Sequence, residues 1–209
     1  MSSISTTVPS ASPAPAPFAL LPPNILEVLR WEAIFGNSHP VALDLGAGDG
    51  GFALAYARAR PDLNLVAVER LLGRVRKIAR RAERGELRNL RVLRLESSYV
   101  VERLCAPGSV SEIHLLFPDP WPKRRHWERR LLQVPFLQLA AQALRPGGAF
   151  RFVTDYAEYF QHGLEVFAQS PQFIRVEEDP ALPYPPTDFE RGFRAEGKPI
   201  HGGVWRKRA

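Results

Sequence analysis

The residue whose type and setting point most directly to chemistry is Asp119, which lies between two prolines in the segment IHLLFPDPWPKRRH, residues 113–126. Prolines fix φ and restrict the residue before them, so we expect the carboxylate of Asp119 to be held in an extended, defined pose. The apolar residues before the loop are typical of a buried strand. In an open α/β sheet, the loop after such a strand lies at the carboxyl edge, where ligands bind. Asp119 is therefore our first candidate for a rigidly presented carboxylate that contacts a ligand.

A second candidate site is the glycine-rich turn GAGDGG, which follows the apolar run 41–45. Glycines let a ligand approach the backbone closely, and the helix that follows would present free N–H groups. Glu69 ends the next apolar run, where an acid can accept hydrogen bonds from two ribose hydroxyls. The turn therefore predicts a nucleotide-like ligand, with Gly46, Gly48 and Gly50 in contact with it.

Two ligand classes fit this turn. Gly46, Gly48 and Gly51 match the dinucleotide pattern G-x-G-x-x-G, so the turn alone is as compatible with a nicotinamide or flavin as with S-adenosylmethionine. Asp44 favours S-adenosylmethionine, because an acid inside the strand can hold the ammonium group of that cofactor. The later segment LRPGGAFRF, residues 144–152, resembles the turn before the fifth strand of class I methyltransferases.

The segment around Asp119 resembles the Pro-Asp-Pro-Trp signature, followed by a basic cluster, of the bacterial tRNA guanine-N7 methyltransferases. The resemblance runs in consistent order from about Val41 to the C-terminus. Its further motifs are Thr154-Asp155, the TDFE segment at 187–190, and GKPIH at 197–201. It implies a Rossmann-like enzyme that transfers a methyl group from S-adenosylmethionine to N7 of a guanosine in tRNA. In this family the target is the guanosine of the variable loop.

Carried over position by position, the resemblance implies a site residue for each part of the reaction. It implies that Asp119 is catalytic and that cofactor contacts come from Asp44, the glycine turn, Glu69, Glu96, Ser97 and Asp119. It implies tRNA contacts from Lys123, Asp155, Thr187, Asp188, Phe189 and Glu190. The sequence departs from the family at Glu96, where Asp is usual, and in lacking any basic residue before Arg30.

The elements that must position these residues alternate between short apolar runs and amphipathic segments. We predict strands over 41–45, 65–69, 90–95, 113–117, 149–154, 173–176 and 200–205. We predict helices over 24–35, 51–59, 71–83, 99–104, 128–144 and 158–168, and the arginines of 71–83 are typical of a solvent-facing helix. This order predicts an α/β fold: a doubly wound, mostly parallel seven-stranded sheet with helices on both faces.

Length and composition predict one such domain. The chain has 209 residues, 45% of them hydrophobic, and a net charge of +6, which suits a phosphate-rich partner such as tRNA. Residues 1–23 are rich in Ser, Ala and Pro, so we expect a disordered leader before a single methyltransferase domain at 24–209. The protein is expected to be a monomer or a homodimer.

Other classes of site and location are disfavoured. The single Cys105 excludes an internal disulfide, and five scattered histidines give no metal-ligand pattern, so no metal is expected. No signal-peptide or membrane-spanning run is present, which predicts a cytoplasmic protein without a membrane partner.

Three alternative functions remain open at this level. One is a methyltransferase acting on an amino group of adenine, because Pro-Asp-Pro-Trp loosely resembles the Asn/Asp-Pro-Pro-aromatic loop of those enzymes. The second is a noncatalytic RNA-binding subunit with the same fold. The third is a Rossmann dehydrogenase that binds NAD.

Overall fold

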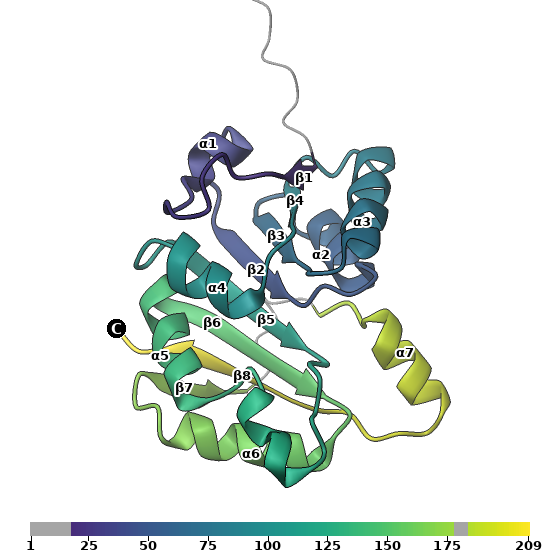
Figure 1. The fold of residues 1–209 in the computed structure, drawn as a ribbon, viewed down its shortest axis with the longest axis vertical. Helices are drawn as coiled ribbons and strands as arrows, with labels where there is room; N and C mark the ends of the chain where they lie inside the picture. Colours follow the sequence, from purple (N-terminus) through teal and green to yellow (C-terminus); the bar gives the residue numbers. More distant parts are fainter. Residues whose placement is uncertain (1–17, 178–183) are drawn as a thin grey trace, which may run out of the picture.

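One mixed sheet of eight strands lies at the centre of the computed structural model, which describes residues 18–177 and 184–209 (Figure 1). Its strands are β1 (Ala19–Leu20), β2 (Val41–Leu45), β3 (Asn64–Val68), β4 (Leu90–Leu93), β5 (Val110–Leu116), β6 (Leu144–Thr154), β7 (Phe173–Val176) and β8 (His201–Lys207). They follow the order β1-β4-β3-β2-β5-β6-β8-β7. Neighbours are parallel except for β8, which is antiparallel to β6 and β7. The predicted α/β sheet is confirmed, with one strand more than the seven expected.

The additional strand is β1, and it lies inside the region predicted to be a disordered leader. Ala19 and Leu20 pair in parallel with Val92 and Leu93 of β4. An edge strand offers unpaired N–H and C=O groups, which an apolar segment can use even next to a Pro-rich stretch. Residues 19 and 20 of the predicted leader thus belong to the sheet, while residues 1–17 lie outside the described residues.

Helices cover both faces of the sheet, as Figure 1 shows. They are α1 (Trp31–Phe35), α2 (Gly51–Ala59), α3 (Leu72–Arg84), α4 (Ser97–Tyr99) with the π-helical turn η1 (Val100–Leu104), the 3-10 helix η2 (Arg124–Arg129), α5 (Val134–Ala143), α6 (Ala157–Ala168) and α7 (Asp188–Ala195). Successive residues of β2 enter different clusters: Leu43 belongs to the cluster that contains residues of η1, α5 and α6, and Ala42 to the cluster that contains residues of α2 and α3. This alternation is the side-chain period of a strand buried on both faces.

Two predicted helices are shorter than expected. The region 24–35 is helical only from Trp31, because the Asn24 side chain accepts a hydrogen bond from Leu26 N (2.9 Å) and closes a local turn. The region 128–144 begins its α-helix at Val134, since Pro135 lacks an N–H and fits only the first helical turn. The residues before it form η2 instead, so the basic cluster lies on a separate short helix.

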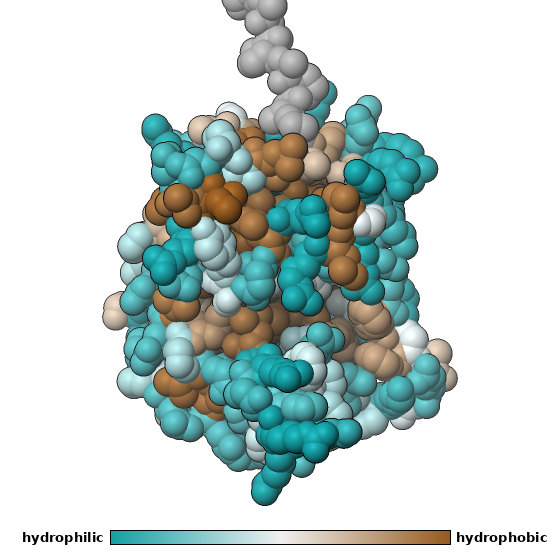
Figure 2. Space-filling model, in the orientation of Figure 1, coloured by the Kyte–Doolittle hydropathy of each residue, from teal (hydrophilic) through white to brown (hydrophobic). Residues whose placement is uncertain are grey.

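Some apolar side chains remain exposed at the end of the molecule that carries β1. Figure 2 shows brown, apolar surface there, and the exposed residues include Leu21 and Leu26 at 80% and Leu71 at 54%. Within the described ranges, no helix combines the length and the apolar composition that crossing a bilayer requires.

Candidate active site

Predicted site residues from distant parts of the sequence line one pocket of about 440 Å³. The pocket lies at the carboxyl ends of β2, β3 and β5, at the point where the strand order reverses. Parallel strands bring their carboxyl ends to one edge, and ligands of open α/β sheets bind at such a reversal. The predicted residues in its lining are Gly46, Gly48, Glu69, Glu96, Ser97, Asp119 and Phe189.

The glycine turn is shaped by hydrogen bonds from the neighbouring strand. The N–H groups of Gly46 and Ala47 both donate to the Val68 carbonyl at 2.9 Å. Gly46 has a φ of 78°, and a Cβ built there would meet no atom within 4 Å, so its backbone borders open space in the pocket. Gly50 is different: it does not line the pocket, and a Cβ there would lie 2.5 Å from Ile78 Cγ1. Close packing against α3 therefore explains glycine at position 50.

Basic residues of α3 hold the same turn from outside. Lys77 Nζ lies 3.0 Å from an Asp49 carboxylate oxygen, and Arg81 Nη1 donates to the Asp49 carbonyl at 3.0 Å. The hydrogen bond from Lys77 holds the pKa of Asp49 below its usual value. Arg74 lines the pocket with its guanidinium 3.8 Å from Glu69. Lys77 is exposed and Arg74 is half-buried, as expected for a solvent-facing helix, and both also pair with acids at the edge of the site.

Asp44 is a buried acid with an unused oxygen. Its side chain lines a second hollow of about 220 Å³, together with the predicted residues Gly46, Thr187, Asp188 and Phe189. Oδ2 of Asp44 has no hydrogen-bond partner among the described residues. Burial, and secondarily the negative charge of Glu69, raises the pKa of Asp44 to about 7. The site therefore contains a carboxylate that a cationic ligand group would satisfy.

The TDFE segment begins α7. Thr187 is its N-cap, with Oγ1 accepting from Glu190 N at 2.9 Å. The Phe189 side chain is half exposed and lines both hollows. Glu190 is only 2% exposed, lies 2.7 Å from an Arg194 nitrogen and lines neither hollow. The motif therefore separates into residues that line the hollows and one buried glutamate that pairs within α7, whose Oε2 has no hydrogen-bond partner among the described residues.

The Pro-Asp-Pro-Trp loop has a strained backbone on both sides of Asp119. Phe117 and Trp121 have positive φ angles of 50° and 42°, which non-glycine residues rarely adopt. The Asp119 side chain is exposed to the pocket. The Arg129 guanidinium lies 5.1 Å from the Trp121 ring, and both residues also line the pocket. The loop thus presents one carboxylate next to a cation and an indole.

Glu96 already serves a structural contact. It is the N-cap of α4, and its Oε2 accepts hydrogen bonds from Tyr99 N at 2.9 Å and from the Ser98 hydroxyl. Besides Gly50 and Glu190, two further predicted residues lie outside both hollows: Lys123 is exposed at the start of η2, and Asp155 is half-buried just after β6.

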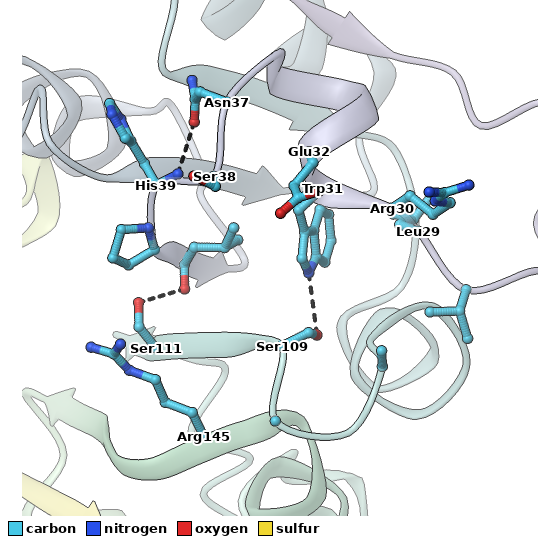
Figure 3. Close-up of a pocket in the computed structure, with 15 residues that line it drawn as sticks. Leu29, Arg30, Trp31, Glu32, Asn37, Ser38, His39, Ser109, Ser111 and Arg145 are labelled. Atoms are coloured by element: carbon cyan, nitrogen blue, oxygen red, sulfur yellow. Dashed lines mark hydrogen bonds between the residues drawn. The ribbon is translucent and has the colours of Figure 1, made fainter.

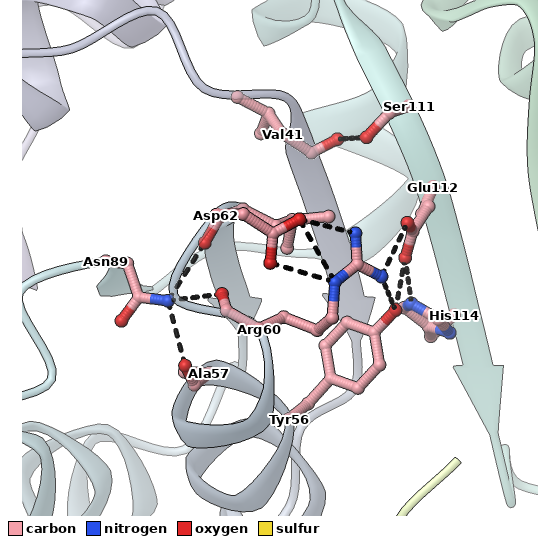
Figure 4. Close-up of polar contacts among 10 residues, drawn as sticks. Val41, Tyr56, Ala57, Arg60, Asp62, Asn89, Ser111, Glu112 and His114 are labelled. Carbon is pink, nitrogen blue, oxygen red and sulfur yellow. Dashed lines mark hydrogen bonds and ion pairs between the residues drawn. The ribbon is translucent and has the colours of Figure 1, made fainter. Parts of the chain in front are cut away.

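A buried polar network, not anticipated from sequence, surrounds the Glu112 carboxylate (Figure 4). His114 of β5 is the register partner of Asp44, and its Nε2 lies 3.2 Å from Glu112 Oε2. The Tyr56 hydroxyl donates to the same carboxylate, and Arg60 lies 3.6 Å from it. Burial lowers the pKa of His114 despite Glu112. The network thus joins α2 to β5 through the Glu112 carboxylate, while His114 Nδ1 has no hydrogen-bond partner among the described residues.

The chain also has a hollow of about 500 Å³ at the opposite, amino-terminal edge of the sheet (Figure 3). Its lining includes Trp31, whose Nε1 donates to Ser109 Oγ at 3.2 Å, together with His39 and Arg145. None of the predicted site residues lines it. Size alone would favour this hollow, but the strained loop and the buried acid place the candidate site at the carboxyl edge.

The strand order, the glycine turn after β2 and the acids after β3 and β4 define a Rossmann-like class I methyltransferase. Solved structures with this fold include the 16S rRNA methyltransferase KamB, with a TM-score of 0.63 at 19% identity, covering 86% of this chain and 93% of that one. A SAM-dependent O-methyltransferase from Thermotoga maritima has a TM-score of 0.55 at 16% identity, covering 81% and 60%.

The chain itself belongs to the tRNA (guanine-N(7)-)-methyltransferase family. Residues 38–202 match a family described as putative methyltransferase. The tRNA (guanine-N(7)-)-methyltransferase of Bordetella pertussis is 38% identical over 177 residues, covering 85% of this chain and 69% of that protein. The enzyme of the same name from Geobacter metallireducens is 36% identical over 203 residues, covering 93% and 94%. Family membership favours a methyltransferase over the NAD-dependent dehydrogenase that the glycine turn alone left open.

Proposed function

We propose that this chain transfers a methyl group from S-adenosylmethionine to N7 of a guanosine in tRNA, the variable-loop guanosine by family resemblance. The observation that carries the proposal is the shared pocket: the glycine turn and Asp119 line one hollow at the carboxyl edge of the sheet. The names of the relatives supply the substrate class.

The residues present fit the cofactor. The unpartnered Oδ2 of Asp44 is suited to an ammonium group, and the open space beside Gly46 admits a ligand against the backbone. Glu69 is placed to accept ribose hydroxyls at the pocket wall, with Ser97 nearby. Glu96 has one carboxylate oxygen engaged with Tyr99 N, so its contact with an adenine amino group uses the other oxygen. When bound, S-adenosylmethionine supplies an electrophilic methyl group on a sulfonium.

Guanine N7 has a lone pair and no proton, so the attacked atom needs no general base. The task of the protein is alignment, which can supply roughly 7–11 kcal/mol of the barrier reduction. Asp119 accepts from guanine N1–H and the exocyclic amine, and its charge stabilises the positive charge that develops on the purine. Trp121 and Phe189, both on the pocket wall, receive the base once it leaves its stack in the tRNA.

The tRNA contacts extend beyond the pocket. Lys123, at the exposed start of η2, pairs with backbone phosphates, and each such pair steepens the salt dependence of binding by about one logarithmic unit. Asp155, Thr187 and Asp188 border the same edge and are assigned to the substrate. Glu190 acts by ordering α7, because its carboxylate is buried and paired with Arg194.

The direct test is incubation of undermodified tRNA with the protein and methyl-labelled cofactor, followed by cleavage chemistry selective for N7-methylguanine. We expect label in tRNA and cleavage at one guanosine, and we expect Asp119→Ala to abolish both while the protein remains folded. Label on an adenine amino group would establish the alternative target. Binding of tRNA together with no S-adenosylmethionine binding by calorimetry and no transfer would support a noncatalytic RNA-binding protein.

A further inference from the structure

A buried arginine lies under the Pro-Asp-Pro-Trp loop. Arg130 is 2% exposed, and its guanidinium carbon lies 4.3 Å from the Trp127 ring centre and 4.7 Å from that of Tyr159. Its Nη1 and Nη2 atoms have no hydrogen-bond partner among the described residues. Removing a cation from water costs several kcal/mol, only part of which two aromatic faces return. Stability alone therefore does not explain an arginine at this position.

The remaining donor of this guanidinium contacts the loop. Nε of Arg130 donates to the Pro120 carbonyl at 2.8 Å, and Pro120 lies between Asp119 and Trp121 in the chain. Among the described residues, no other side chain forms a hydrogen bond with residues 118–122.

The loop needs such an anchor because its backbone is strained. The positive φ angles at Phe117 and Trp121 each cost on the order of 1–3 kcal/mol, and such conformations persist only where the surroundings enforce them. At the first end, Phe117 N–H donates to the Val153 carbonyl of β6 at 2.8 Å. At the other end, the Pro120 carbonyl is held by Arg130, which is itself fixed between two rings.

We propose that Arg130 is a positioning residue that fixes the position of the Asp119 carboxylate through its hydrogen bond to the Pro120 carbonyl. The inference rests on the proposed role of Asp119 in methyl transfer. Arg130 itself is covered by the aromatic rings and does not line the pocket, so it acts through the loop.

A pair of substitutions separates the hydrogen bond from the charge. In Arg130→Gln, the side-chain amide nitrogen takes the same place along the side chain as Nε, so the donor is kept and the charge is lost. In Arg130→Met, a methyl group takes that place and the donor is lost too. Replacing a buried cation by a neutral side chain of similar size is often neutral or stabilising, so both variants are expected to fold. Arg103→Met, at an exposed site on η1, is the matched control.

Single-turnover methyl transfer to tRNA is measured for each variant, with cofactor affinity from calorimetry and a melting curve. We expect Arg130→Met to lower the transfer rate about 100-fold, because a misplacement of about 1 Å can cost that much. We expect Arg130→Gln to stay within about fivefold of the parent rate, and cofactor affinity to change little in both. In an Asp119→Asn background, Arg130→Met should lower the rate no further.

The proposal is overturned if the Met and Gln variants lose activity equally, if Arg130→Met keeps the parent rate, or if its effect is undiminished in the Asp119→Asn background. Should Arg130→Met not fold, Arg130→Leu, which also lacks the donor, takes its place with the same criteria. A failure of the proposed function looks different: the parent protein then gives no N7-methylguanine at all.

Discussion

The Gly48 N–H donates to the Glu69 carboxylate across 3.0 Å, joining the glycine turn to the end of the next strand. The other oxygen of Glu69 accepts from Leu71 N at 2.8 Å, at the entry to α3. One buried side chain thus fixes the turn and faces the pocket proposed for the cofactor. The shape of the turn and ligand affinity should therefore depend on the same carboxylate.

Glu69→Gln is expected to weaken cofactor binding by about 10-fold to 100-fold. The amide keeps one acceptor oxygen and loses the charge, and a hydrogen bond to a charged group contributes about 1.5–3 kcal/mol. Calorimetric titration with S-adenosylmethionine measures the change. Glu83→Gln, exposed near the end of α3, is the control and should bind as the parent does. Equal affinity of Glu69→Gln and parent would contradict the role given to Glu69.

Asp44→Asn is expected to stabilise the free protein at high pH. Burial raises the pKa of Asp44 from 3.8 to about 7, so between these values the folded state holds a proton that the unfolded chain has released. The contribution of Asp44 to the free energy of unfolding therefore falls as pH rises from about 4 to about 7, and is constant above that. Asn carries no charge and avoids this loss. Urea unfolding at about pH 8 should therefore give the variant a free energy of unfolding about 1–3 kcal/mol above that of the parent, and near pH 4 the two should be equal.

Asp62→Asn is the control for that measurement, because the hydrogen bond from Arg60 lowers the pKa of Asp62. Its contribution has the opposite sign, so this variant should gain nothing at high pH. An Asp44→Asn variant that is less stable than the parent at every pH would show that the carboxylate is not destabilised by burial.

Cofactor affinity of the parent protein is expected to rise between about pH 6 and pH 7.5. An ammonium group pairs with the ionised form of Asp44, and below its pKa of about 7 that form must first release a proton. Affinity should fall up to about 10-fold for each pH unit below the pKa. Calorimetry in buffers of different ionisation enthalpy counts the protons released. If cofactor binding releases no protons at pH 6, Asp44 does not bind the ammonium group.

Thr187→Ala is expected to lower methyl transfer while leaving the melting temperature within a few degrees. The substitution removes the N-cap hydrogen bond of α7, and such a bond typically contributes about 1 kcal/mol to the free energy of unfolding. It also makes the residues that border the second hollow less well ordered. Thr187→Ser keeps the hydroxyl and should keep most of the activity. If the Ser and Ala variants are equally impaired, the missing methyl group and not the cap is responsible.

Gly163→Ala is expected to destabilise the protein although alanine is the better helix former. A Cβ at this position of α6 would lie 2.6 Å from Phe152 Cε1 and 3.0 Å from Leu132 Cδ2, and such overpacking costs about 1–3 kcal/mol. Gly73→Ala in α3 meets no atom within 4 Å and should stabilise by about 0.5–1 kcal/mol. Chemical denaturation of both variants should therefore give opposite signs.

Local sequence patterns predict the class of fold and most of the residues that line the two hollows at the carboxyl edge of the sheet. Apolar runs alternating with amphipathic segments predict a parallel sheet, because buried strands and surface helices have different side-chain periods. Proline on both sides of Asp119 and glycines after β2 also act locally, through backbone sterics. For that reason their positions could be located without knowing what they pack against.

How those segments are held, and which side chains face the pocket, depends on contacts between elements that are distant in the sequence. Ala19 and Leu20 form a strand only because β4 offers a free edge. At Gly50 the contact with Ile78 of α3 adds to the demand of a positive φ, and Arg130 reaches the Pro120 carbonyl from beyond η2. Such contacts join residues far apart in sequence or on different elements, and their energy depends on burial and distance, which local composition does not encode.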